Sequence, residues 1–179
     1  MIWRLSHRCD RMARPLADRH YNRQSPGHPN IAPPGACLVL LTETRDAYWI
    51  TSAPLAEYVK HDWPGAWVCS AFRNEGAGLS SEMVRSAVAA TRAVLGEAPP
   101  RGFVTFVDPE QTRRKRDPGR CFVRAGFFRT GRTKGGLVAL RMASPPRAGE
   151  HGCHTMPDAE APHGWHPQPS IFAAGGLEP

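Results

Sequence analysis

The hydrophobic pattern of the chain is dominated by short apolar runs that are separated by turn residues. Four runs are rich in β-branched, aromatic and other apolar residues and are bounded by Gly, Pro, Asp or Asn; they span residues 36–42, 47–52, 66–72 and 101–108. Runs of this length and composition predict β-strands. Only four residues separate the first two runs, so we expect these two strands to pair as a hairpin.

One longer segment has the spacing of a helix rather than that of a strand. A set of mainly apolar residues lies on one face at helical spacing: Met83, Val84, Ala87, Val88, Thr91, Val94 and Leu95. Ser80 or Ser81 is a suitable N-cap, and Gly96 is a suitable end. Shorter helical pieces are expected at 11–20, 55–60 and 121–125. A last hairpin is expected from 127–130 and 137–142. The pattern predicts an α/β (α+β) fold with a mixed central β-sheet flanked by helices.

Proline and glycine mark two segments that the pattern excludes from this sheet. Residues 25–35 contain four prolines and two glycines and are expected to form a loop. After Met142 the periodicity ends, and residues 144–179 are rich in Pro, Gly and His. Such a segment buries too little apolar area to offset its chain entropy. We therefore expect a single domain over residues 1–143 and a disordered tail over residues 144–179.

The charge is distributed unevenly along the 179 residues. Residues 1–143 hold 22 Lys and Arg against 12 Asp and Glu, whereas residues 144–179 hold one Arg and four acidic residues. A basic domain attracts polyanions such as nucleic acid or the phosphates of a cofactor, although an Arg-rich composition that reflects a GC-rich genome is the alternative. The five cysteines are widely spaced without a CxxC pair, which argues against a disulfide scaffold or a four-thiolate zinc site. No apolar run reaches the length of a membrane span, and the basic N-terminus lacks the apolar core of a signal peptide. A cytoplasmic protein without a membrane partner is the expectation.

The candidate chemistry begins between the third predicted strand and the long helix. Arg73, Gly76 and Gly78 form an Arg-x-x-Gly-x-Gly sequence that leads into Ser80 and Ser81. Glycines let a backbone approach a ligand closely, and a helix N-terminus adds partial positive charge. The residues therefore predict a pyrophosphate-binding loop; a simple turn before a helix is the alternative.

This Arg73-x-x-Gly76-x-Gly78 sequence resembles the acetyl-CoA pyrophosphate loop of the GNAT acetyltransferase superfamily. The order of elements over residues 36–142 is similar too, and 121–127, ending in Gly126-Phe127, resembles the Tyr-x-x-x-Gly-Phe element of that superfamily. The resemblance implies a GNAT-like single domain and an acyl-CoA-dependent transferase that binds acetyl-CoA or a related acyl-CoA.

A narrower resemblance is to the Mom-type adenine DNA-modification proteins of phage Mu and its relatives. It is carried by His20-Tyr21 with Arg23, by 72–75, by Ser80-Ser81, by 104–108, by the basic stretch 115–127 and by 133–136. That family implies transfer of an acyl-derived group to the exocyclic amine of adenine in DNA, which finally gives a carbamoylmethyl-type adduct. It also implies a phage or prophage origin and DNA as a partner.

Three titratable residues are the catalytic candidates: His20, Tyr21 and Asp108. Asp108 ends a predicted strand, where ligands of open sheets commonly bind. A turn-capping carboxylate is the alternative for Asp108, and a packing pair is the alternative for His20 and Tyr21. Many acetyltransferases place a tyrosine four residues before the Gly of Gly-Phe as the general acid. Here that position is Phe122, which has no proton to donate, so another group or water must act.

Further candidates concern nucleic acid and metal. Arg113, Arg114, Lys115 and Arg116, with Arg120, follow Asp108 and suit a nucleic-acid backbone, although a charge run is more often a solvated face. A base modified in duplex DNA must be flipped out, and Trp63, Trp67, Tyr48 or Phe122 could stack on it. His20, Tyr21 and Asp108 are conceivable metal ligands, but their spacing does not support a site. The histidines of the tail suit compositional bias better than a metal tract.

Three functions therefore remain open from the sequence. The first is acyl transfer to adenine in DNA. The second is acetyl transfer to a small amine or a protein amino group. The third is nucleic-acid binding without catalysis. Acetyl-CoA binding separates the first two from the third, and analysis of DNA nucleosides separates the first from the second.

Overall fold

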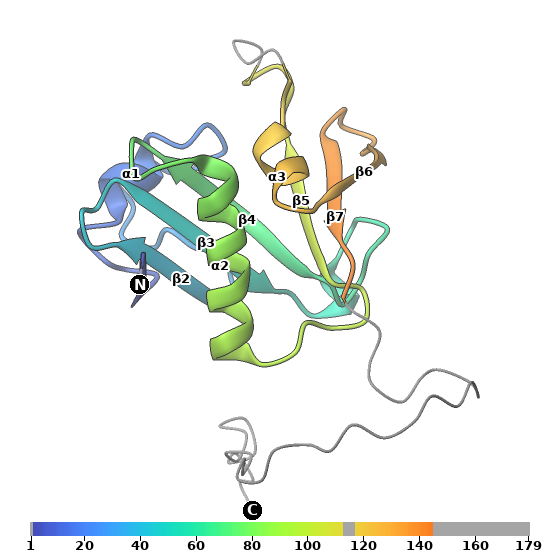
Figure 1. Ribbon diagram of the computed structural model, residues 1–179, viewed down its shortest axis with the longest axis horizontal. Helices are drawn as coiled ribbons and strands as arrows, with labels where there is room; N and C mark the ends of the chain where they lie inside the picture. Colours follow the sequence, from blue (N-terminus) through green and yellow to red (C-terminus); the bar gives the residue numbers. More distant parts are fainter. Residues whose placement is uncertain (1, 113–116, 145–179) are drawn as a thin grey trace, which may run out of the picture. The chain divides into compact units, whose positions relative to one another are not determined.

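The computed structural model describes residues 2–112 and 117–144 (Figure 1). The predictions for residues 113–116 in the basic run and for residues 145–179 of the tail lie outside the described residues. Within them the chain forms a seven-stranded sheet with the strand order β1-β2-β3-β4-β5-β7-β6. The strands are β1 (Trp3–Ser6), β2 (Ala36–Thr42), β3 (Ala47–Ala53), β4 (Trp67–Asn74), β5 (Phe103–Val107), β6 (Phe128–Arg132) and β7 (Val138–Met142). The helical elements are α1 (Arg14–Asp18), the 3₁₀ turn η1 (Ala56–Tyr58), α2 (Ser80–Leu95) and α3 (Arg120–Arg124).

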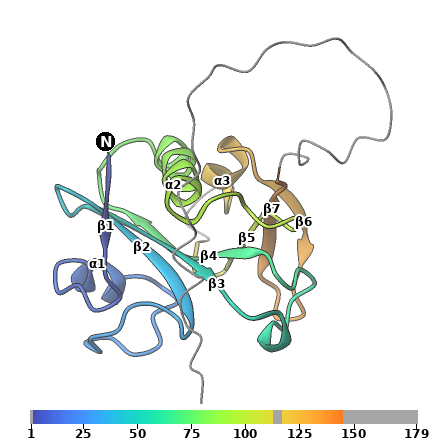
Figure 2. The same cartoon turned by 90° about the horizontal axis from the view of Figure 1, so that it is seen from below.

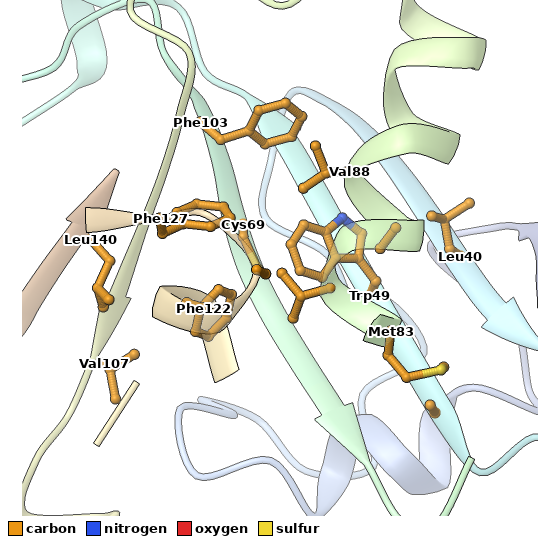
Figure 3. Packing of buried hydrophobic residues seen from close by; sticks show 14 of the residues in the cluster. Leu40, Trp49, Cys69, Met83, Val88, Phe103, Val107, Phe122, Phe127 and Leu140 are labelled. Carbon is orange, nitrogen blue, oxygen red and sulfur yellow. The ribbon is translucent and has the colours of Figure 1, made fainter. Parts of the chain in front are cut away.

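Both faces of the central strands are buried, because helical segments cover the sheet on each side (Figure 2). Along β3, Trp49 packs in a core with α2 and α3, whereas Tyr48 and Ile50 pack in a second core with α1. Figure 3 shows Trp49 of the larger core beside Met83 and Val88 of α2. The near-continuous apolar runs of β2 and β3 are explained by this double burial.

A polar chain inside the larger core links β3 to α2. The indole Nε1 of Trp49 donates to Thr51 Oγ1 at 2.7 Å, and Thr51 Oγ1 lies 3.1 Å from Thr91 Oγ1. Thr91 donates its own proton to Ala87 O at 2.8 Å. The Thr51 hydroxyl must therefore accept from Trp49 and donate to Thr91. These buried polar groups are satisfied, and they fix the position of α2 on the sheet.

Strands β4 and β5 are neighbours and parallel, but they pair over three residues only. The paired positions are Trp67–Cys69 with Phe103–Thr105. Every other neighbouring pair in the sheet is antiparallel. Beyond Cys69, the β5 side of β4 has no strand partner among the described residues, and the Ser70 carbonyl accepts the side-chain amide of Asn22 at 3.0 Å instead.

A bulge in β4 lies at the point where this pairing ends. Ile50 of β3 pairs with Ala71 and Thr51 pairs with Cys69, which leaves Ser70 as an extra residue. Cys69 consequently faces the α2 core and Ala71 faces the α1 core, although they are two positions apart. Bulges bend and twist a strand, and this one accompanies the separation of β4 from β5.

The coarse fold prediction, a mixed α+β sheet flanked by helices, is confirmed for the described residues. Gly96 ends α2 with φ +83°, as expected. One expectation needs correction, and one strand was missed. Neither Ser80 nor Ser81 is the N-cap, because Leu79 holds that position without a side-chain cap. The first strand, β1, was not predicted at all. No helix among the described residues is long and apolar enough to cross a membrane.

Candidate functional site

A cleft of about 400 Å³ lies in the gap between β4 and β5; we call it the first cleft. Residues from five parts of the chain line it: the segment after α1, the two separating strands, the start of α2 and the start of α3. Its position follows from the topology, because the only parallel pair of the sheet opens toward the carboxyl ends of both strands. The predicted residues Arg73, Ser80, His20, Tyr21 and Arg120 all border this cleft.

The glycine bend (residues 73–78) joins β4 to α2 and is organised by the side chain of Asn74. Its Oδ1 accepts the N–H groups of Gly76 and Ala77 at 3.1 and 2.9 Å, and its Nδ2 donates to Gly78 O and Ser80 Oγ at 2.7 and 3.1 Å. Gly76 and Gly78 have φ values of +123° and +141°. No atom lies within 4 Å of a Cβ built on either glycine, so no side chain obstructs the bend.

The geometry refines the expected anion site. Asn74 already occupies the N–H groups of Gly76 and Ala77, so these two amides are not free donors. The N–H groups of Ser80 and Ser81, in the first turn of α2, have no acceptor among the described residues. Ser80 borders the cleft, whereas Ser81 is buried. The available donors therefore come from the start of the helix more than from the glycines.

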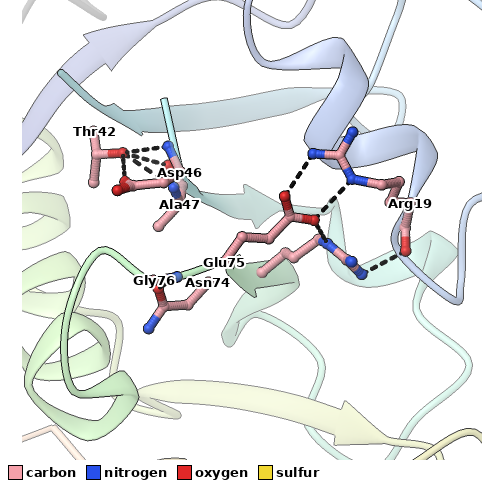
Figure 4. Close-up of polar contacts among 8 residues, drawn as sticks. Arg19, Thr42, Asp46, Ala47, Asn74, Glu75 and Gly76 are labelled. Atoms are coloured by element: carbon pink, nitrogen blue, oxygen red, sulfur yellow. Dashed lines mark hydrogen bonds and ion pairs between the residues drawn. The ribbon is translucent and has the colours of Figure 1, made fainter. Parts of the chain in front are cut away.

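Arg73 borders the first cleft and belongs to an ion cluster with Glu75 and Arg19. Its Nε donates to Glu75 Oε1 at 2.5 Å, and one NH group donates to Arg19 O at 2.5 Å. Arg19, just after α1, binds the same carboxylate through two N–H groups at 2.8 and 2.6 Å. Figure 4 shows the Glu75 carboxylate between the two guanidinium groups. Hydrogen bonds from Arg19 and then from Arg73 lower the pKa of Glu75 to about 2. The cluster fixes the bend against the segment that carries His20 and Tyr21.

His20 and Tyr21 lie side by side at the edge of the gap. Their rings stack with centroids 4.6 Å apart, and His20 also meets Tyr48 edge-on at 6.2 Å. His20 is 8% exposed, and this burial lowers its pKa, so the ring is neutral at pH 7. The N–H of Asn22 donates to His20 Nδ1 at 3.3 Å, which places the ring proton on Nε2. This imidazole supports Tyr21 by packing; its Nδ1 is already occupied.

The structure brings Tyr21 and Asp108 together. The backbone N–H of Asp108 donates to the Tyr21 hydroxyl at 3.4 Å. Burial, with the nearby charge of Asp108, raises the pKa of Tyr21, so the phenol holds its proton at neutral pH. The carboxylate Oδ1 of Asp108 accepts the N–H groups of Glu110 and Gln111 at 2.8 and 3.3 Å. The turn-capping role of Asp108 is therefore present, and Oδ2 has no partner within residues 2–112 and 117–144.

Several expected positions differ from their predicted roles. Tyr48 and Phe122 are 1% and 7% exposed and lie in the two cores, so they are not free to stack on a base. Trp67 packs edge-on against Phe103 in the larger core. Arg120 is exposed beside the first cleft. Its position suits a phosphate at the start of α2 as well as a nucleic-acid backbone.

Comparison with known proteins does not place the chain in a family. No protein family, no curated protein and no solved structure matches it. The described residues also contain no group of three or more His, Cys, Asp or Glu side chains that could hold a metal ion. The assignment of chemistry therefore rests on the geometry of the site.

Sequence reasoning missed two features of the site. Asn74 organises the glycine bend, and an Asn directly before a glycine-containing turn is a recognisable signal of this role. The pairing of Arg19 with Glu75 joins positions that are 56 residues apart, and no local signal predicts such a contact.

Proposed function

We propose that this protein is an acyl-CoA-dependent transferase with a GNAT-like fold, and that its acceptor is the exocyclic amine of adenine in DNA. The observation that carries the proposal is the gap between β4 and β5, which is lined both by the start of α2 at Ser80 and by Tyr21. A long cofactor with a diphosphate and an extended arm fits a gap of this kind. The proposed acceptor is drawn from the resemblance in the sequence.

The residues present fit such a cofactor in three respects. Ser80 and the free amides of the first turn of α2 offer donors for a diphosphate, and Arg120 adds charge beside them. Arg73 is held at the same end by Glu75. The side of β4 after Cys69 that has no strand partner offers its remaining backbone groups to the amides of an extended arm, because the Ser70 carbonyl already accepts from Asn22 and the Phe72 backbone from His20. Bound there, an acyl-CoA would supply the thioester that the acceptor amine attacks.

The proton transfers are assigned to Tyr21 and Asp108. With an acyl-CoA bound, the protonated Tyr21 hydroxyl would donate a proton to the departing sulfur as the C–N bond forms and the C–S bond breaks. The free Oδ2 of Asp108 accepts the proton that the amine loses. His20 acts by holding Tyr21 in place through ring stacking. Tyr21 thereby replaces the acid that Phe122 is unable to provide.

The test is mass spectrometry of deoxynucleosides from DNA of cells that express the protein. A modified deoxyadenosine is expected with the wild type and not with Tyr21→Phe expressed at the same level. An unmodified adenine pool under good expression of the wild type would refute the DNA acceptor. Acetylation of added amines by the same preparation would then support an ordinary acetyltransferase.

A further inference from the structure

A second cleft, of about 610 Å³, lies beside the first, and its mixed lining includes the rings of Tyr21, Tyr58, His61 and Phe106. The two clefts share Tyr21, Asn22, Cys69, Ser70 and Phe106. Arg73, Asn74 and Ser80 border the first cleft only, whereas Gly76 and Gly78 of the bend border neither, and Tyr58 of η1 and Asp108 border the second only. The donor and the acceptor can therefore enter by different clefts and meet at the Tyr21 hydroxyl.

Half-buried and exposed rings line or adjoin this second cleft. His61 lies 5.1 Å from Phe106 and 6.1 Å from Trp63, and Trp63 lies 6.2 Å from Phe106, all between ring centroids. Tyr58, in η1, is 75% exposed on the rim. Burial lowers the pKa of His61, so its imidazole is uncharged at pH 7 and presents an apolar face. Large exposed aromatics that border a cavity offer a surface to a flat partner.

We propose that the second cleft binds a single unstacked nucleobase, held between Tyr58 and the His61–Phe106 pair. This inference rests on the transferase proposed above, because that reaction requires a base displaced from its strand. Aromatic side chains bind displaced bases through their π-faces, which all bases share.

Polar groups on the rim favour a base over a purely apolar ligand. Gln111 is exposed, and its side-chain amide has no partner among the described residues. A side-chain amide offers a donor and an acceptor together, which matches the edge of an adenine. Lys60 is exposed on the same rim and suits the adjoining phosphate. Asp108 also lines the cleft, beside the Tyr21 hydroxyl, and its carboxylate suits an amine on the base.

The experiment compares two short single strands with the same phosphate backbone. One strand is wholly abasic, and the other carries one central adenine between abasic positions. Anisotropy of a terminal dye measures both affinities for the wild type, Tyr58→Ala, His61→Ala and the matched control Phe128→Ala. Phe128 is 48% exposed on β6 and borders neither cleft. Calorimetry with acetyl-CoA is run on the same four proteins.

The wild type and Phe128→Ala should bind the adenine-bearing strand about tenfold more tightly than the abasic strand. Tyr58→Ala and His61→Ala should lose most of this advantage and keep the wild-type affinity for acetyl-CoA. Equal binding of both strands by the wild type, or an undiminished advantage in both variants, would overturn the inference. If the wild type binds no acetyl-CoA but still binds the adenine-bearing strand more tightly than the abasic strand, the proposed transferase function is refuted. The proposal that the second cleft binds a base is then supported on its own.

Discussion

The buried chain from Trp49 through Thr51 to Thr91 makes a quantitative prediction about stability. Thr51→Val keeps the shape and β-branching of the residue but removes the acceptor of the Trp49 indole N–H. Trp49, Thr51 and Thr91 are each 0% exposed, so water does not replace the lost partner. An unsatisfied buried donor costs about 1–3 kcal/mol. For a domain of this size, that corresponds to a Tm lower by roughly 3 to 10 °C.

Thr91→Val provides the comparison, because it removes the acceptor of Thr51 and leaves the Trp49 bond in place. Its cost should fall in the same range of about 1–3 kcal/mol, because it leaves the buried Thr51 hydroxyl proton without an acceptor. Thr130→Val, on the edge strand β6, should change the free energy of unfolding by less than either. Urea unfolding of the three variants gives the values. A Thr51→Val or a Thr91→Val protein as stable as the wild type would refute the assigned direction of the hydrogen bonds.

Three further predictions concern the site and the end of the described chain. Because the folded pKa of Glu75 is about 2 and the ordinary value is 4.5, its contribution to stability is complete above pH 4.5 and lost as the pH falls toward 2. Glu75→Gln should therefore lower the urea midpoint at pH 6 but leave it nearly unchanged at pH 2. Tyr21→Phe should abolish transfer. It should shift the Tm by less than about 2 °C, because the Tyr21 hydroxyl makes one long hydrogen bond at 3.4 Å. A modified nucleoside that still forms with Tyr21→Phe would contradict the role of Tyr21 as the acid. A chain that ends after Ser144 should be more stable than a chain that ends after Ala143, because the Ser144 hydroxyl donates to Pro99 O at 2.6 Å. This hydrogen bond is worth about 1 kcal/mol. Equal melting curves for the two truncated proteins would contradict the prediction.

The sheet could be predicted largely from the sequence because its strands are apolar on both faces. The runs at β2, β3, β4 and β5 are continuous and are bounded by turn residues, so length and composition identified them. Strand β1 escaped prediction because it is only four residues long, and only its first residue, Trp3, is buried. Such a strand forms because β2 is available to pair with it, which a local pattern does not reveal.

The site could be predicted less completely than the fold. The glycines and Arg73 were found from local spacing, and His20, Tyr21 and Asp108 from the resemblance and from strand ends. Three observations depended on the three-dimensional structure: the bulge at Ser70, the occupied Nδ1 of His20, and the amides that Asn74 satisfies. These three features depend on contacts between segments or on the exact course of the backbone. Composition and hydrophobic periodicity contain no information about either.

The central claim is that the gap between β4 and β5 holds an acyl-CoA by its diphosphate at the start of α2. Isothermal titration calorimetry with acetyl-CoA tests it on the wild type, on Arg73→Ala and on Arg132→Ala, which removes an equal charge from β6 away from the cleft. We predict one saturable site in the wild type and in Arg132→Ala, and binding at least tenfold weaker in Arg73→Ala. No saturable binding to the wild type, or equal affinity in all three proteins, would contradict the account.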